Sequence, residues 1–178
     1  MQTGIYALNV YMHRVMAIVK EIGEFPMSAN NATVICGVTD FLGGVCAIWV
    51  MHKLGRKTIL LMGHASMGTM QILSATFFFL GMPKPMYGFM NGFIFSFSIT
   101  SGPVTWLIIS EVCCDTAMGL VILGLYASCM QQVLSMEYLM NGDGFGLDNT
   151  LWLFGGENFL CVIFLLMFVK ETRGLTDL

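Results

Sequence analysis

Six long, predominantly hydrophobic runs follow one another along this chain, separated by short polar connections. The runs cover residues 3–22, 31–51, 58–81, 86–110, 117–140 and 150–169. Each has the roughly 20 residues that an α-helix needs to cross a hydrocarbon layer about 30 Å thick. They are continuously apolar rather than alternating, which favours helices over a membrane β-barrel. The pattern predicts an all-α integral membrane protein in which residues 1–178 form a single bundle of six transmembrane helices.

The basic residues of the connections predict which way the bundle faces. An even number of spans places both termini on one side of the membrane, together with the connections near residues 52–57 and 111–116. Five basic residues lie on that side and two on the other: Lys53, Arg56, Lys57, Lys170 and Arg173 against Lys20 and Lys84. Because positive charge marks the cytoplasmic side, we expect both termini on the cytoplasm-like face.

Composition agrees with a membrane location. Hydrophobic residues make up 56% of the chain and charged residues 11%, against roughly 25% charged residues in soluble domains. The net charge of −3 lacks the basic surface of a nucleic-acid-binding protein. These values exclude a water-soluble monomer and a nucleic-acid binder, so the lipid bilayer is the expected surrounding.

Neither a cofactor nor a metal is expected. Four of the six cysteines lie inside the hydrophobic runs, where a thiol is usually a small apolar filler. The adjacent pair Cys113-Cys114 lacks the spacing of a zinc site. The polar residues inside the runs show neither a nucleophile–base spacing nor a metal pattern such as H-E-x-x-H. The chain is therefore predicted not to be an enzyme.

A few polar residues lie within the hydrophobic runs, where a charged side chain is a functional candidate by default. They are Arg14, Asp40, His64, Gln131, Gln132 and Glu157. Arg14 and Asp40 both fall near mid-membrane on successive helices, so they could pair. Such a pair is either a proton or ion relay or a structural link between two helices. Glu157, near the centre of the last run, is expected to face protein rather than lipid.

Three short motifs mark the ends of hydrophobic runs. They are Gly55-Arg56-Lys57 after the second run, Gly102-Pro103 with Trp106 and Ser110-Glu111 in the fourth, and Glu171-Thr172-Arg173-Gly174 after the sixth. Their order and spacing resemble the second half of the sugar porters of the major facilitator superfamily, whose signatures read D-x-x-GR[RK], GPxxWxxxSE and PET[KR]G. The resemblance covers the whole chain and implies a fold like one six-helix half of a twelve-helix transporter.

For each motif, the resemblance implies a role in transport, and the residues alone allow a purely structural role. The basic turn around Arg56 locks the cytoplasmic gate in the family by pairing with carboxylates; taken alone, it is a positive-inside anchor. Gly102-Pro103 removes a backbone donor, so that the helix either bends beside a cavity or only kinks for packing. Trp106 lies on the same helix face as Gly102. By resemblance it lines the substrate pocket, and otherwise it is an apolar anchor.

The sequence also departs from the family at positions that matter for transport. His52 stands where the family has an acidic residue before the basic turn, and Met118 stands where the family has an arginine. We therefore expect Arg56 and Glu111 each to lack an ionic partner, which removes a working gate. Of the family's sugar-binding positions only Trp106 is retained, so hexose binding in the family's manner is not expected.

These departures favour a transport-inactive half of a sugar porter that serves as a structural or accessory subunit of a larger membrane complex. Other membrane subunits and bound lipid would then cover its inward-facing polar positions. The alternative is a functional hexose-type transporter half that works as a dimer or with a separate N-terminal half, a homodimer being the less favoured arrangement. Because the sequence begins inside its first run, we expect no other half before it. An organellar inner membrane is the expected location.

Overall fold

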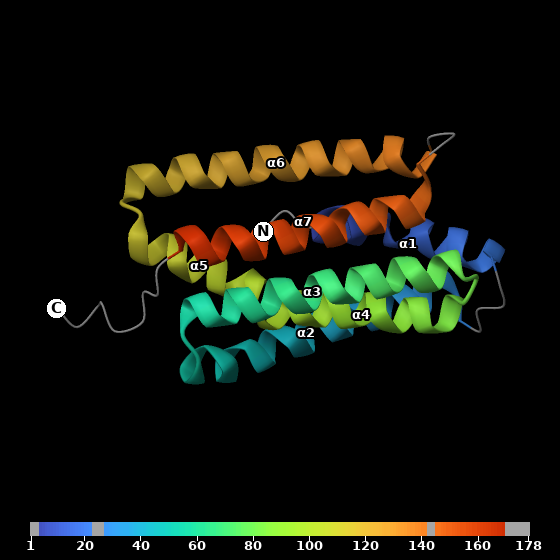
Figure 1. The fold of residues 1–178 in the computed structure, drawn as a ribbon, viewed down its shortest axis with the longest axis horizontal. Coiled ribbons are helices and arrows are strands. Elements are labelled where there is room, and N and C mark those ends of the chain that lie inside the picture. Colours follow the sequence, from blue (N-terminus) through green and yellow to red (C-terminus); the bar gives the residue numbers. More distant parts are fainter. Residues whose placement is uncertain (1–3, 23–26, 142–144, 170–178) are drawn as a thin grey trace.

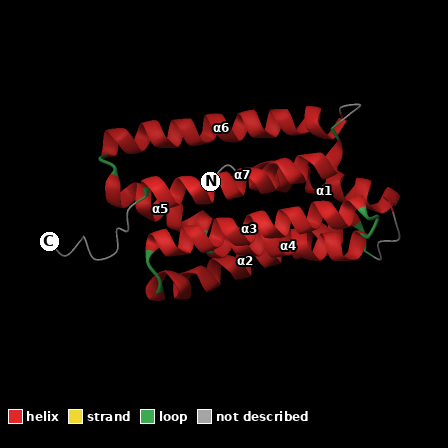
Figure 2. Ribbon diagram, viewed as in Figure 1, coloured by secondary structure: helices red, strands yellow, loops and turns green. Residues whose placement is uncertain are grey.

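The computed structural model describes residues 4–22, 27–141 and 145–169, and within these ranges its regular structure is entirely helical (Figure 1, Figure 2). The helices are α1 (Ile5–Ile22), α2 (Ala29–Lys53), α3 (Arg56–Phe79), α4 (Pro83–Ile99), α5 (Ser101–Val112), α6 (Asp115–Asn141) and α7 (Gly146–Phe168). The helices lie side by side with short connections at their ends (Figure 1). The all-α fold class predicted from the hydrophobic runs is confirmed.

Four helical segments are long and apolar enough to cross a membrane on length and composition alone. They are Ala29–Lys53, Pro83–Val112, Thr116–Met140 and Gly146–Phe168. The helices α1 and α3 also cover predicted runs, but they carry more polar side chains. Arg14 and Lys20 lie in α1, while α3 includes the buried residues His64 and Gln71. These two helices are therefore adapted to contact with protein as well as with lipid.

The fourth predicted run is broken into two helices. α4 ends at Ile99 and α5 begins at Ser101, with Thr100 between them at φ −117° and ψ −82°. Pro103 accounts for the break, because its ring has no N–H to donate and clashes with the carbonyl four residues earlier, that of Ile99. The helix therefore changes course one turn before the Gly102-Pro103 pair, where the sequence predicts that it loosens.

Close backbone contact joins α3 to α7. A Cβ atom added to Gly155 would lie 2.7 Å from Cγ1 of Ile72, and one added to Gly68 would lie 3.1 Å from Cβ of Asn158. Small residues at such positions let two membrane helices approach and gain packing contacts along their length. α3 also packs against α4 and α5 and thus lies at the centre of the bundle.

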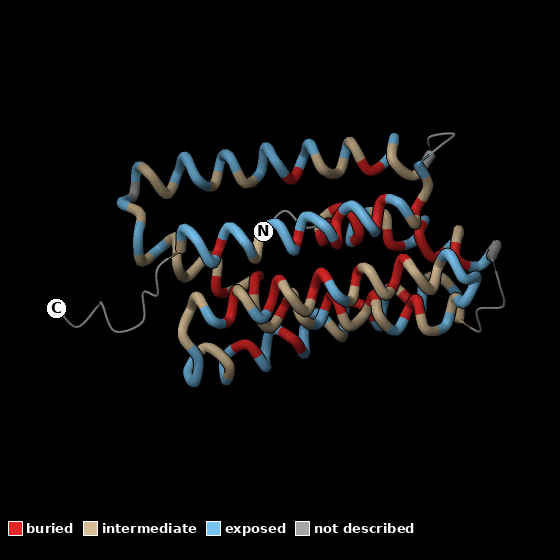
Figure 3. The backbone as a smooth tube through the Cα atoms, viewed as in Figure 1, coloured by how far each residue is buried: buried red, intermediate tan, exposed pale blue. Residues whose placement is uncertain are grey.

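α6 lies apart from this centre. It packs mainly against α1 and α7, and its only buried side chains in the described part of the chain are Cys129 and Met136. Figure 3 shows α6 mostly exposed or intermediate beside the buried faces of the other helices. Its outward face carries apolar side chains such as Leu120, Leu123 and Tyr138. Such a surface suits contact with lipid or with another transmembrane protein.

We expect Gly155→Ala to lower the free energy of unfolding by about 1–3 kcal/mol, because the added methyl group must displace Ile72 in a close-packed interface. Thermal unfolding of the purified protein in detergent measures the effect. The neighbouring Gly156 is the matched control, since a Cβ atom there would meet nothing within 4 Å. Gly156→Ala should be neutral or stabilising because alanine favours helix over glycine. Equal losses in both variants would contradict the assigned contact between α3 and α7.

Candidate functional site

The basic turn is built where α2 ends and α3 begins. Gly55 precedes the first turn of α3 in an extended conformation, with φ −70° and ψ 150°, and its carbonyl accepts a hydrogen bond from the N–H of Ile59. Arg56 is thus the first residue of α3. Lys57 reaches α7, where its Nζ donates to the carbonyl of Leu166 over 3.2 Å.

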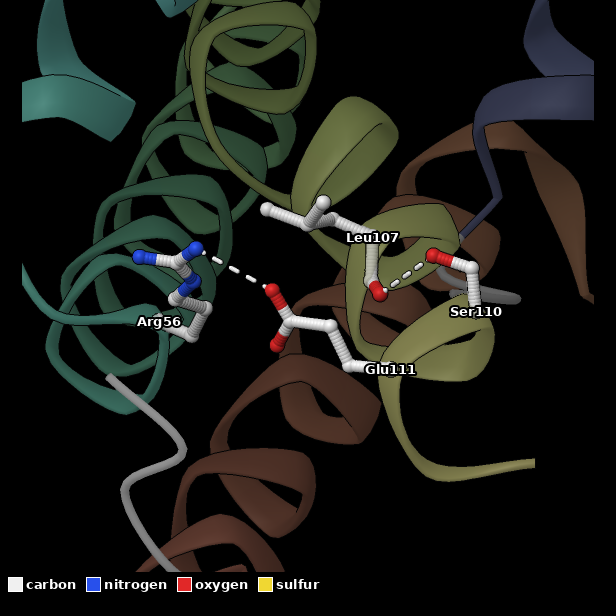
Figure 4. A network of polar contacts seen from close by, with 4 residues as sticks. All are labelled: Arg56, Leu107, Ser110 and Glu111. Atoms are coloured by element: carbon white, nitrogen blue, oxygen red, sulfur yellow. Dashed lines mark hydrogen bonds and ion pairs between the residues drawn. The ribbon is translucent and has the colours of Figure 1, made fainter. Parts of the chain in front are cut away.

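An ion pair joins this turn to the end of α5. Nη2 of Arg56 lies 3.0 Å from Oε1 of Glu111 (Figure 4). The side chains are only 24% and 17% exposed, so water screens the attraction less than at an open surface. Beside the pair, Ser110 donates to the carbonyl of Leu107 over 2.8 Å. This contact fixes the hydroxyl to its own helix rather than to the charged pair.

The expectation that Arg56 and Glu111 each lack an ionic partner is therefore wrong. The residues that pair with Arg56 and Glu111 in the family are indeed replaced, but here the two residues pair with each other. The two residues are 55 positions apart, and the antiparallel arrangement of the helices brings the start of α3 and the end of α5 to the same end of the bundle (Figure 1). Each residue satisfies the charge of the other.

A cavity of about 720 Å³ opens next to this ion pair. Its walls come from α2, α3, α5 and α6. The lining residues are Ile48, Met51, His52, Arg56, Pro103, Trp106, Leu107, Ser110 and Met118. The volume falls within the range of small-molecule sites, roughly 300–1,000 Å³. The structure thus gathers Trp106, Pro103, Ser110 and Arg56 around one space, whereas Gly102 packs against Phe97.

The predicted pairing of Arg14 with Asp40 is wrong. Nη1 of Arg14 lies 3.8 Å from Oε1 of Glu137 on α6. Asp40 instead lies against α4, where Oγ of Ser98 contacts its Oδ1. Arg14 and Asp40 belong to successive helices, but the two side chains turn toward different neighbours. Both members of the Arg14–Glu137 pair are largely exposed, so this contact contributes little to stability.

His64 belongs to a buried polar network between α3, α5 and α7. Its Nδ1 lies 2.9 Å from Oδ1 of Asn158, and its Nε2 lies 3.4 Å from Oγ of Ser101. Nδ2 of Asn158 donates to Oε1 of Gln71 over 2.7 Å. No member of the network is more than 2% exposed. Because the Asn158 amide donates to Gln71, its oxygen faces His64 as an acceptor, so Nδ1 of His64 carries the proton.

Sequence reasoning singled out His64 but missed its partners. Gln71 lies seven residues after His64, two turns along the same face of α3. That spacing was the available signal for a polar face on this helix. Asn158 and Ser101 gave no such signal, because they join the network only through helix packing.

Glu157, which the sequence predicts to face protein rather than lipid, lies opposite polar residues of α6. Its side chain is exposed and lines a second groove of about 270 Å³ between α6 and α7, together with Gln131 and Gln132. The neighbouring residue Asn158 points the other way and is fully buried. Glu157 and Asn158 therefore lie on two different faces of α7.

The closing motif of Glu171, Thr172, Arg173 and Gly174 lies outside the described residues. Among the residues that are described, no three His, Cys, Asp or Glu side chains gather as a metal centre would require.

Comparison with known proteins identifies the family. A profile described as "Sugar (and other) transporter" matches residues 2–177. The arabinose-proton symporter of Bacillus subtilis is 28% identical over 176 residues, which cover 96% of this chain and 38% of that protein. The facilitated trehalose transporter Tret1 of Bombyx mori is 26% identical, over 97% of this chain and 35% of that protein. This chain therefore spans little more than a third of these relatives.

The fold is also found among solved structures. The partially occluded inward-open xylose transporter XylE from E. coli superposes with a TM-score of 0.78 at 22% identity, over 98% of this chain and 38% of that chain. XylE is a major facilitator superfamily protein. The helices α1 to α7 therefore have the fold of one part of such a transporter, as the motifs predict.

The ion pair can be tested by a double-mutant cycle. Arg56→Gln or Glu111→Gln alone should lower the free energy of unfolding, because each leaves a largely buried charge without its partner. We expect a coupling energy of about 1–2 kcal/mol from unfolding measurements in detergent. The matched cycle on the exposed Arg14 and Glu137 should give less than about 0.5 kcal/mol. Equal coupling energies would contradict the distinction between the two pairs.

The buried network makes a separate prediction. Asn158→Leu should lower the free energy of unfolding by about 1–3 kcal/mol, because His64 and Gln71 lose a hydrogen-bond partner away from water. Asn149→Leu on the same helix is the control, since Asn149 is exposed and donates to the nearby carbonyl of Phe145. Thermal unfolding measures both variants. A loss at Asn149 as large as at Asn158 would refute the role of the network.

Proposed function

Because this chain belongs to the sugar (and other) transporter family, we propose that it forms one six-helix half of a membrane carrier for sugars or chemically similar solutes. Carriers of this kind move a solute by rocking two halves around a site near the middle of the membrane. The proposal therefore includes a second six-helix half, which faces the cavity beside Trp106.

The Arg56–Glu111 ion pair is the observation that carries this proposal. If Arg56 and Glu111 had lost their ionic partners, the gate would no longer work and an inactive accessory subunit would be favoured. Instead the basic turn and the end of α5 are held together by a largely buried contact of 3.0 Å. Such a contact can stabilise one arrangement of the helix ends and break in another, as alternating access requires.

The cavity supports a small polar solute with an apolar face. The indole of Trp106 can stack on the C–H face of a pyranose ring, as aromatic side chains commonly do in small-molecule sites. Ser110 and His52 add hydroxyl and imidazole groups to the same wall. The relatives named above carry arabinose and trehalose, and these are the substrate classes we propose to test.

The apolar part of the cavity favours a second candidate, a transport-inactive structural subunit. Five of its lining residues, Ile48, Met51, Pro103, Leu107 and Met118, offer no side-chain hydrogen bond to a sugar. An acyl chain or a helix of another membrane subunit would suit that wall. The carrier requires that the second half supply the missing hydrogen bonds.

Exchange of labelled sugar across vesicles distinguishes the two candidates. The protein, purified together with whatever it co-purifies with, should catalyse counterflow of labelled arabinose, xylose or trehalose. Trp106→Ala should raise KM by about tenfold, because the stacking contact is lost. Trp152→Ala on α7, which does not line the cavity, should leave exchange unchanged. An assembly that exchanges none of these sugars would overturn the carrier and favour the subunit.

A further inference from the structure

A stripe of four polar side chains lies on one face of α6. Ser128, Gln131, Gln132 and Ser135 are spaced i, i+3, i+4 and i+7, which places them on a single face of a helix. In a segment otherwise apolar enough to span a membrane, such a stripe is costly unless it faces polar partners. It faces Glu157 of α7, with which all four residues line the 270 Å³ groove.

The groove lies midway along the length of both helices. Glu157 is the middle residue of α7 and Ser128 the middle residue of α6, so roughly 16 Å of helix or more separates each from either end. The groove shares no lining residue with the cavity around Trp106. It is therefore a separate site within the same half.

The groove presents mainly oxygen acceptors. The Ser128 hydroxyl donates to the carbonyl of Gly124 over 2.9 Å, and that of Ser135 to the carbonyl of Gln131 over 2.7 Å. Each hydroxyl proton is thus committed to its own helix, and lone pairs remain for a ligand. The Glu157 carboxylate is acceptor-only when ionised, and no residue in the described ranges hydrogen-bonds or ion-pairs with it.

We propose that this groove binds one monovalent alkali cation, sodium or potassium, through the Glu157 carboxylate and the oxygens of the α6 stripe. One carboxylate balances one positive charge, which relieves the cost of a bare anion at mid-membrane depth. A divalent ion would leave a net positive charge there and generally requires more carboxylates. At about 30 Å³ for each water, the groove has room for the ion with several waters of hydration.

A sugar fits this groove less well than a cation. The serine protons are already used, which leaves the amide groups of Gln131 and Gln132 as side-chain donors to a sugar hydroxyl. A sugar is neutral and would not balance the charge of the Glu157 carboxylate, whereas a cation does. Phe154, the aromatic residue of the lining, is only 3% exposed, which leaves little ring surface on which a sugar could stack. The cation site does not depend on the proposed transport function, because binding can be measured without transport.

Equilibrium binding of radioactive sodium, and of rubidium as a tracer for potassium, tests the proposal on the purified protein in lipid nanodiscs. We expect saturable binding of at least one of the two ions. That ion should also raise the unfolding temperature above the value in N-methylglucamine chloride of equal ionic strength. Glu157→Gln should weaken binding by at least about tenfold and abolish the thermal shift.

Two further variants make the result decisive. Glu137→Gln removes an equal charge from α6 outside the groove and should leave binding unchanged. Gln131→Leu keeps the carboxylate but removes an amide oxygen, and should weaken binding even if Glu157→Gln does not fold. The proposal is overturned if the folded native protein binds neither ion, if both groove variants bind like the native protein, or if arabinose or xylose binds the groove in place of the ion.

Discussion

A polar group held between membrane helices must find its partner inside the protein, because the surrounding hydrocarbon supplies none. That requirement organises this bundle. At one end it brings Arg56 of α3 against Glu111 of α5. In the interior it joins His64, Asn158 and Gln71 across α3 and α7. α3 and α7, which carry the interior contacts, are also closely packed against each other, with Gly68 and Gly155 at their interface.

The molecule has a closely packed part and a loosely packed part. α3, α4, α5 and α7 share buried polar contacts and glycine packing, whereas α6 keeps most of its surface exposed (Figure 3). α6 nevertheless carries the polar stripe that faces Glu157. A helix that buries few side chains and turns a polar face toward α7 can be drawn toward α7 by a ligand. The cation proposed for this groove would act in that way.

The break between α4 and α5 connects the packed interior to the cavity. Ser101, the first residue of α5, contacts His64, and the same short helix carries Trp106 and Glu111. A movement of α5 would therefore affect the buried network, the cavity wall and the ion pair together. This coupling supports the proposed carrier role over a purely structural one.

The sequence by itself determined the helical class, the approximate course of most helices and the family, because continuous apolar runs and local motifs depend only on neighbours along the chain. It also placed the break near Pro103, which follows from a missing N–H. Only the tertiary structure decided which charges meet. Arg56 pairs with Glu111 and Arg14 with Glu137, contrary to both expectations, because partner choice depends on how helices distant in sequence rotate and pack against one another.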